Sequence, residues 1–418
     1  MPAQSQTTSQ MVDLGSRSVE NAVHKAIEHA VAEKASDLML LAHEDYYSIN
    51  IRQLGVIRPL SIVSNELGKR FAQHIKAHAG MDVAEHRHPH DGRWIYDELV
   101  EEGSDEEDET VDRAVDLRIS SIPTLYGEDM VIRLLSRRTG LFNLDKIGLS
   151  KKELGDVKLM LDSPGGLILC CGPTGSGKTA TLYAALDYLN NGSKKINTIE
   201  DPIEFGIDGL RQSQTNNTIG IHFAQLLRGV LRQSPDVIMI GEIRDKETAT
   251  TAVHAANSGH IVLSTIHAPV AAAAVESMRS LGVNDHFLAT ALRGVISQRL
   301  VRTLDTERRV EYDISHAPQI FEPITHLLDG IDGKTFYAPG AGEGHTGYDA
   351  QTGVFEVMSM NSQLRSMVSN GADTNELRKQ AHEDGMLDFK SNALLKVAQG
   401  ITSIEEVFRV IPSEYLED

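Results

Sequence analysis

Cysteine is nearly absent from this 418-residue chain, which contains only Cys170 and Cys171. The two residues are adjacent on an expected strand, so their side chains point to opposite faces of the sheet and do not form a disulfide with each other. We interpret them as buried thiols of a protein from a reducing compartment, with redox or metal chemistry as the lesser alternative. The fold is therefore expected to be stable without disulfides.

Long hydrophobic stretches are also missing. Apolar runs such as residues 166–172 and 271–275 are far shorter than the roughly 20 residues that are needed to cross a bilayer. Residues 1–16 are polar, lack the apolar centre of a secretory signal peptide and are interpreted as a flexible tail. We expect a cytoplasmic protein that associates with membranes only peripherally.

Basic charge is scarce as well. The chain has 40 Lys and Arg residues against 59 Asp and Glu residues, which gives a formal net charge of −19. Acidic residues, with no basic one among them, crowd positions 97–112, which we interpret as a solvated loop, with an acidic interaction surface as the lesser alternative. The excess of negative charge argues against broad, charge-driven binding of nucleic acids.

The periodicity of apolar residues predicts two domains. A smaller α+β domain is expected over residues 17–138, and a linker over 139–150 leads to an α/β domain over 151–418. In the smaller domain the pattern predicts helices at 19–35 and 65–79 and strands at 37–41, 48–54, 55–59, 93–96 and 114–119.

Strands and helices alternate in the larger domain, which is the rhythm of a parallel sheet with crossover helices. We expect strands at 167–171, 195–199, 236–240 and 261–265, with a helix at 179–190. After about residue 305 the pattern weakens through a glycine-rich stretch and then returns as helices between 361 and 410. A helical C-terminal subdomain is therefore expected.

A complete phosphate-binding loop follows the first of these strands. Its sequence is Gly172-Pro-Thr-Gly-Ser-Gly-Lys-Thr179, which matches G-x-x-x-x-G-K-[ST] between an apolar strand and a helix. Backbone N–H groups of such a loop wrap the phosphates, Lys178 reaches the outer phosphates, and the Thr179 hydroxyl ligates Mg²⁺. A chance match in an ordinary loop is the alternative, which the strand and helix on either side disfavour. The residues predicted to bind ATP are Gly172, Pro173, Thr174, Gly175, Ser176, Gly177, Lys178, Thr179 and Thr181.

Acidic residues follow two other expected strands. Glu242 comes after the strand at 236–240, and the cluster from Glu200 to Glu204 comes after the strand at 195–199. Because the carboxyl ends of parallel strands meet at one edge of a sheet, both sets should face the phosphates. Glu242 is a candidate for orienting water or holding Mg²⁺. A plain surface carboxylate is the alternative.

Histidines occur at both ends of the strand at 261–265. His267 follows the strand at its carboxyl end, where it could sense the γ-phosphate, with a purely structural role as the lesser alternative. His260 precedes the strand and is interpreted as structural, with a functional role as the lesser alternative. His86, His88 and His90 have an alternate spacing around a proline that suits an irregular loop better than a closed metal site.

Four motifs in order resemble the secretion ATPase superfamily, the motors of type II secretion and type IV pili. They are the phosphate loop, Thr198-Ile-Glu-Asp-Pro-Ile-Glu204, Ile240-Gly-Glu-Ile-Arg-Asp245 and Gly259-His-Ile-Val-Leu-Ser-Thr-Ile-His267. The similarity spans about residues 17 to 412. It implies a RecA-like ATPase domain preceded by a PAS-like domain, in subunits that form a hexameric ring.

The resemblance also implies roles for single residues. Glu204 and Glu242 would be the catalytic carboxylates, with Glu242 and Thr179 at Mg²⁺, and His267 would couple the γ-phosphate to motion. Arg93 and Arg118, in segments that match those sending arginines to the nucleotide, would reach ATP from the PAS-like domain. Closing of the two domains on ATP would be the power stroke.

The C-terminal part resembles assembly and secretion motors more than retraction motors, through Thr352-Gly-Val-Phe-Glu-Val357 and Gly400-Ile-Thr-Ser-Ile-Glu-Glu-Val407. The resemblance implies work with an inner-membrane platform protein. No structural zinc is expected, because residues 304–353 contain no cysteine. A counterpart of the family's extra N-terminal docking domain is not expected either. His267 is followed by Ala268-Pro269 where Thr-Asn is usual.

Three alternatives remain beside a motor for pilin assembly or secretion. The chain could drive pilus retraction or DNA uptake, it could be a RecA-like nucleic-acid translocase, or it could be a scaffold that binds nucleotide without hydrolysing it. The negative charge argues against the translocase, and the intact Lys178, Glu204 and Glu242 argue against the scaffold.

Overall fold

The chain divides into two compact units, with the main boundary at residues 139/140. The computed structural model describes residues 11–97, 114–136, 143–313, 335–340 and 346–416, and positions 322, 324, 327, 328 and 342. The acidic run at 98–112 lies outside the described residues. No helix in the described ranges is long and apolar enough to cross a membrane.

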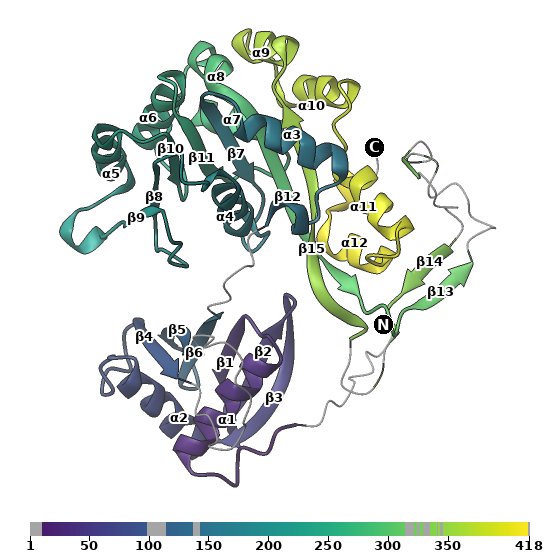
Figure 1. The fold of residues 1–418 in the computed structure, drawn as a ribbon. Coiled ribbons are helices and arrows are strands. Elements are labelled where there is room, and N and C mark those ends of the chain that lie inside the picture. The colour runs from purple at the N-terminus through teal and green to yellow at the C-terminus, as the bar shows by residue number, and fades with distance from the viewer. Residues whose placement is uncertain are drawn as a thin grey trace. The chain divides into compact units, whose positions relative to one another are not determined.

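The N-terminal unit is a six-stranded antiparallel sheet in the order β3-β2-β1-β6-β5-β4, with two helices (Figure 1). Ser18 and Ser64 cap the helices by accepting a hydrogen bond from an amide in the first turn. Its elements are α1 (Val19–Ala32), β1 (Asp37–Ala42), β2 (Tyr46–Gln53), β3 (Val56–Ser64), α2 (Asn65–His78), β4 (His90–Asp97), β5 (Ala114–Pro123) and β6 (Glu128–Ser136). Strand β6 was not predicted from the sequence.

The core of this unit lies between the helices and one face of the sheet. Alternate residues of the strands, such as Leu38 and Leu40 of β1 and Leu117 and Ile119 of β5, are buried with apolar residues of α1 and α2. The other face of the sheet carries the charged residues of β4 and β5. Its likeness to a PAS domain stays a prediction.

The C-terminal unit is built on a seven-stranded sheet in the order β15-β12-β7-β11-β10-β8-β9. All neighbouring strands are parallel except β12 and β15. The strands are β7 (Gly166–Cys171), β8 (Ile196–Glu200), β9 (Arg211–Gln214), β10 (Val237–Ile240), β11 (Ile261–Ile266), β12 (Leu292–Leu304) and β15 (Tyr348–Ser359). The predicted α/β fold with a parallel sheet is confirmed.

Helices cover both faces of this sheet (Figure 1). They are α3 (Lys151–Leu161), α4 (Lys178–Leu189), α5 (Phe223–Val230), α6 (Lys246–Asn257), α7 (Ala273–Ser280), α8 (Asp285–Ala291), α9 (Ser362–Ser369), α10 (Thr374–Glu383), α11 (Phe389–Ala398) and α12 (Ile404–Val410). The 3₁₀ turns within the described ranges are η1 (Leu144–Lys146), η2 (Asn217–Ile219), η3 (Leu231–Gln233) and η5 (Ser413–Tyr415). Helices α3 and α4 pack on one face, and α5 to α10 pack on the other.

The two cysteines follow this arrangement. Cys170 belongs to the core beneath α3 and α4, and Cys171 belongs to the opposite core. Both thiols are free and buried, as the sequence predicted, and burial raises the pKa of each well above its usual value. Neither thiol is therefore a nucleophile at neutral pH.

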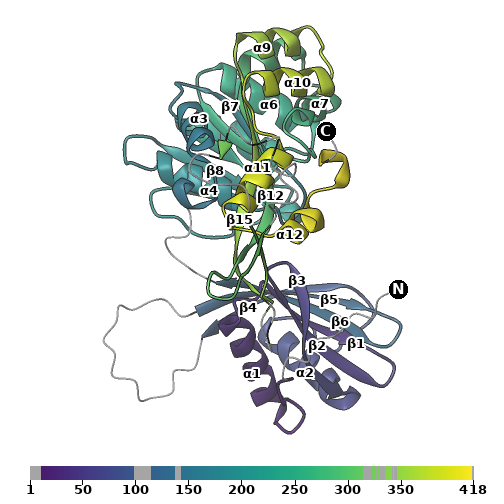
Figure 2. The ribbon, with the colours of Figure 1, turned by 90° about the vertical axis from the view of Figure 1, so that its right-hand side faces the viewer.

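The C-terminal part is not only helical. Strand β15 pairs antiparallel with residues 294–304 of β12, and β13 (Val310–Asp313) pairs with β14 (Thr335–Ala338) in a separate ribbon. Helix α11 packs against β15 and α12 packs against β12 (Figure 2). We expected no strand in this region, because the apolar pattern weakens there through a glycine-rich stretch. The tertiary pairing with β12 makes the strand.

Candidate nucleotide-binding and catalytic site

The loop between β7 and α4 has the backbone conformation that a phosphate-binding loop needs. Gly172, Gly175 and Gly177 have φ values of +143°, +77° and +87°, in the region that favours glycine. A Cβ at Gly172 would lie 2.5 Å from the carbonyl oxygen of Gln298, so a larger residue does not fit there. Gly177 is the N-cap of α4 and gives no side-chain cap, which leaves the first amides of the helix able to donate to an anion.

Lys178 lies over this loop. Its ammonium group donates hydrogen bonds to the carbonyl oxygens of Gly172 and Pro173, each at 2.9 Å. Partial burial lowers the pKa of Lys178, and the nearby Glu242 opposes that change. The Lys178 ammonium group is half-buried and is held by backbone oxygens of its own loop. It is therefore placed to bind a negatively charged group that enters from the solvent.

Glu242 and His267 meet at the carboxyl ends of the neighbouring strands β10 and β11. His267 Nε2 lies 2.8 Å from one carboxylate oxygen of Glu242, and the Arg244 guanidinium donates to the other at 2.7 Å. The Glu242 side chain is 16% exposed, whereas the His267 side chain is 62% exposed. The hydrogen bond that Arg244 donates to Glu242 raises the pKa of Arg244. The carboxylate is thus fixed between two side chains, and both of these, Arg244 and His267, are largely open to solvent.

The acidic cluster after β8 has one buried and one partly exposed member of interest. Glu200 is buried and accepts hydrogen bonds from the hydroxyls of Tyr183 and Thr198 and from the Gln212 amide. Tyr183 is on α4, so these bonds connect the cluster to the helix that follows the phosphate loop. Glu204, four residues later, lines the same cavity as Glu242.

A cavity of about 470 Å³ joins these groups, within the usual size of small-molecule sites. Among the predicted residues it is lined by Thr174, Gly175, Gly177, Lys178, Thr179, Glu204, Glu242 and His267. Gly172, Pro173, Ser176 and Thr181 do not line it, and Thr181 is buried in α4. Apart from Thr181, the predicted residues of this unit therefore line the cavity or belong to its phosphate loop.

The two predicted arginines lie side by side in the N-terminal unit. Arg93 on β4 and Arg118 on β5 are directly opposed in the register of the two strands. Arg93 donates two hydrogen bonds to Asp116, at 2.8 and 2.7 Å, which raise its pKa. In the register of β5 with β6, Arg133 stands opposite Arg118, so a third arginine continues the row. Their role at the nucleotide stays a prediction.

His260, His86 and His88 each contact another part of the protein. The ring of His260 bonds to the Ala255 carbonyl oxygen at the other end of β11. His86 and His88 lie near the carboxylates of Glu128 and Glu85, and no group of three metal-ligating side chains occurs among the described residues.

Other residues that support the site, among them one on β12, were not predicted from the sequence. The Gln298 side-chain amide donates to the Ser176 carbonyl oxygen at 2.6 Å and so holds the phosphate loop from below. Arg244, the partner of Glu242, was inside a quoted motif and could have been found there. Gln298 carried no such signal, because it lies 122 residues from Ser176 in the chain.

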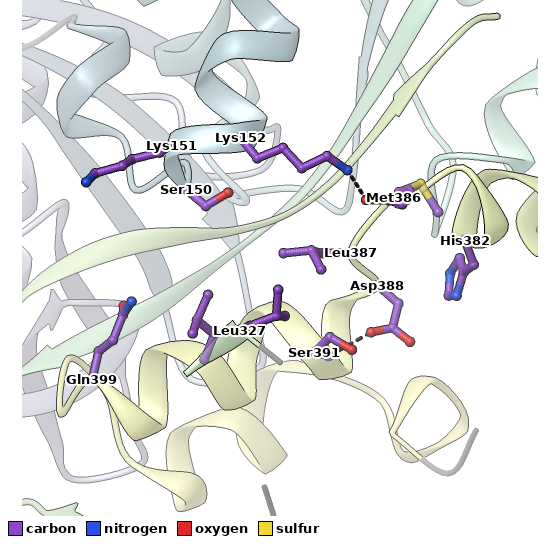
Figure 3. A pocket seen from close by; sticks show the side chains of 12 residues that line it. Ser150, Lys151, Lys152, Leu327, His382, Met386, Leu387, Asp388, Ser391 and Gln399 are labelled. Atoms are coloured by element: carbon purple, nitrogen blue, oxygen red, sulfur yellow. Dashed lines mark hydrogen bonds between the residues drawn. The ribbon is translucent and has the colours of Figure 1, made fainter. Parts of the chain in front are cut away.

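A second cavity, of about 700 Å³, lies in the same unit between the start of α3 and the segment that leads into α11 (Figure 3). Lys152 donates to the Gly385 carbonyl oxygen across it, and Asp388 caps α11 by accepting from the Ser391 amide. No phosphate loop and no predicted catalytic residue borders this cavity, so the larger space is not the nucleotide site.

Comparison with known proteins gives the family of the chain. The model of the family described as type II/IV secretion system protein matches residues 13–409. The chain belongs to that family. The Type II secretion system protein E of Xanthomonas campestris is 39% identical over 390 residues, which are 93% of this chain and 66% of that protein. The Type IV pilus assembly ATPase PilB of Pseudomonas aeruginosa is 35% identical, again over 93% of this chain and 66% of the relative.

Solved structures share the fold. The ATPase DotB of Legionella pneumophila aligns with a TM-score of 0.69 at 20% identity, covering 95% of this chain and 97% of that chain. The pilus retraction motor PilT with bound ADP aligns with a TM-score of 0.59 at 22% identity, covering 92% of this chain and 96% of that chain. With the family and the intact phosphate loop together, this secretion-family chain is an ATP-hydrolysing enzyme that binds nucleotide.

Proposed function

We propose that this ATPase is a motor subunit that powers the assembly or secretion of pilin-like subunits at the inner membrane. The observation that carries the proposal is the convergence of a phosphate loop, two acidic segments and His267 on one cavity at one edge of the sheet. Such an edge is where open α/β sheets bind ligands. The family membership suggests that ATP hydrolysis drives secretion or pilus assembly.

In this proposal the ATP phosphates lie on the amides of the loop and of the first turn of α4, with Lys178 at the outer phosphates. Glu204 and Glu242 are the carboxylates that orient the attacking water and accept its proton, and His267 detects the γ-phosphate through its bond to Glu242. Arg93 and Arg118 neutralise charge on the phosphates from the N-terminal unit. Binding and loss of the γ-phosphate would then move the two units relative to one another.

Magnesium fits the same cavity. Mg²⁺ takes one or two protein oxygens and completes its shell with phosphate oxygens and water, so it needs no dedicated cluster of protein ligands. The Thr179 hydroxyl and the Glu242 carboxylate both line the cavity and are oxygen donors of this kind. The ion, when bound, neutralises negative charge on the β- and γ-phosphates.

The wider assembly is also part of the proposal. We expect a homo-hexamer at the cytoplasmic face of the inner membrane that contacts a platform protein of a pilus or secretion system, with no direct binding of nucleic acid. The relatives named for secretion and pilus assembly favour this role over retraction. The C-terminal segments quoted above favour it as well.

Steady-state ATP hydrolysis by the purified chain tests the catalytic part. Lys178→Ala and Glu242→Gln should each lower turnover by at least about 100-fold, because each removes a group that acts on the transferring phosphoryl group. Matched controls are Lys195→Ala and Glu276→Gln. Lys195 precedes β8, at the end of the strand away from the cavity, and its side chain bonds to a backbone carbonyl oxygen; Glu276 is an exposed residue on α7. Turnover that is unchanged in either active-site variant would contradict the proposal.

A deletion strain tests the direction of the work. Loss of surface fibres, or of a secreted protein from the medium, is expected for an assembly or secretion motor. An excess of surface fibres would instead assign the chain to retraction.

A further inference from the structure

Side chains of the three strands β7, β12 and β15 form hydrogen bonds with the turn that follows His267. Residues 268–272 lead from the end of β11 into α7, and most of them are buried. Three successive backbone groups of this turn, in Pro269, Val270 and Ala271, each bond to a buried side chain. An exposed loop would not need such anchors, and they fix a segment that begins beside the Glu242–His267 contact.

The first anchor is Arg299 on β12. Its guanidinium donates to the Pro269 carbonyl oxygen at 2.8 Å, and the residue is only 5% exposed. Burial lowers the pKa of Arg299, and the guanidinium lies 4.9 Å from the centre of the Phe389 ring. The preceding residue, Gln298, holds the phosphate loop. Adjacent residues of one strand therefore contact the two loops that border the nucleotide cavity.

The second anchor is Glu356 on β15. One of its carboxylate oxygens accepts a hydrogen bond from the Ala271 amide at 2.9 Å, and the residue is fully buried. The other oxygen has no hydrogen-bond partner among the described residues. Burial of a carboxyl group that lacks some of its hydrogen bonds lowers the stability of the fold, which suggests that Glu356 has a further role.

The third anchor is weaker. The Cys171 thiol lies 3.7 Å from the Val270 carbonyl oxygen, at the end of the strand that enters the phosphate loop. Hydrogen bonds from a thiol are weak, so this contact packs against the turn but does little to fix its orientation.

We propose that Arg299 and Glu356 are positioning residues for ATP hydrolysis, which fix the turn behind His267 and through it hold the imidazole against Glu242. The inference rests on the proposed role of His267 and Glu242 in catalysis. Neither Arg299 nor Glu356 lines the nucleotide cavity, so both act only through the backbone of the turn. Because a displacement of about 1 Å at a catalytic group can reduce a rate by up to about 100-fold, anchors of this kind matter for turnover more than for substrate binding.

Replacement of Glu356 separates this role from simple packing. Glu356→Leu removes the acceptor and leaves the buried Ala271 amide unpaired, whereas Glu356→Gln keeps an acceptor oxygen in the same place. We expect Glu356→Leu to lower kcat by about 10-fold with the KM for ATP changed less than about twofold. Glu356→Gln should restore kcat to within about twofold of the natural chain.

Glu153 provides the matched control. It is also buried, its pKa is also raised by burial, and it accepts a hydrogen bond from a backbone amide, that of Ser150, at 2.8 Å. That bond lies at the start of α3, and Glu153 does not contact the turn. Glu153→Leu should lower the free energy of unfolding without lowering kcat of the folded protein.

Arg299 gives an independent route if Glu356→Leu does not fold. Arg299→Met removes the bond to Pro269 but keeps apolar contact with Phe389, and Arg299→Lys keeps a donor, so the first should lower kcat and the second should lose less. Where both single variants fold, the losses in Arg299→Met and Glu356→Leu should not multiply in the double variant, because both act on one turn.

The inference would be overturned by a normal kcat in folded Glu356→Leu or Arg299→Met, by failure of Glu356→Gln to restore kcat, or by losses that multiply. These results leave the proposed function intact, since that is tested separately by the turnover of Lys178→Ala and of Glu242→Gln and by the deletion strain.

Discussion

The buried carboxyl group of Glu356 gives the stability of this protein a predictable dependence on pH. Burial raises the pKa of Glu356 to about 7 from an ordinary value of 4.5, and the bond from Ala271 only partly opposes this change. Arg378 on α10 also lowers the pKa, Asp388 before α11 raises it, and Arg299 faces the group from β12. At pH 8 the folded protein must therefore hold a buried negative charge that the unfolded chain exposes to water.

The sign follows from the bound proton. Between pH 4.5 and 7 the folded state holds a proton on Glu356 that the unfolded state has released, so the free energy of unfolding falls as the pH rises through this window. A difference of about 2.5 pKa units corresponds to roughly 3 kcal/mol, of which about 2 kcal/mol should be lost between pH 5.5 and pH 8. Above the folded pKa no further loss is expected from this group.

Glu356→Gln should remove this dependence, because the amide does not titrate. Urea unfolding of the natural chain and of the Gln variant at half-unit steps from pH 5.5 to 8 measures it, with the exposed Glu276→Gln as the control. The Gln variant should gain stability relative to the natural chain as the pH rises, by about 2 kcal/mol over the range. A difference that stays constant across the range, or that changes in the opposite direction, would refute the reasoning.

Three further predictions address the site. Gly172→Ala should weaken ATP binding by at least about 10-fold in a titration with a fluorescent nucleotide, because the new Cβ would meet the Gln298 carbonyl oxygen and φ is +143°; an unchanged affinity would contradict the close approach. Tyr183→Phe should lower the free energy of unfolding by about 1 to 2 kcal/mol in urea, since buried Glu200 loses one donor, and a neutral result would mean that the bond is dispensable. Asp116→Asn should reduce ATP turnover less than Arg93→Ala does, because it loosens the arginine without removing it; equal turnover in both variants and the natural chain would exclude Arg93 from catalysis.

Local signals in the chain were sufficient for the central part of the site. The phosphate loop is contiguous, and an apolar strand before it and a helix after it follow from periodicity alone. The meeting of Glu242 and His267 was predictable in outline, because both follow parallel strands whose carboxyl ends share one edge. The 2.8 Å contact between them, and the second bond from Arg244, depend on the order of β10 and β11 in the sheet.

Other elements gave weaker signals. The strand β6 has alternating apolar residues but was missed beside an expected linker, and β15 is interrupted by glycine and charged residues. In β15 the pairing with β12 overrides the local pattern, since a strand's stability comes from its neighbours more than from its own composition.

Short motifs, whose residues are neighbours in the chain, were sufficient to predict a nucleotide site, its carboxylates and the family of this protein. The contacts that support this site could be found only in the folded chain. Gln298 lies 122 residues from the loop that it holds, and Glu356 lies 85 residues from the amide that it binds. Such contacts form when segments that are distant in the chain become neighbours in the sheet. The pattern of apolar residues in one segment does not show which other segment it will contact.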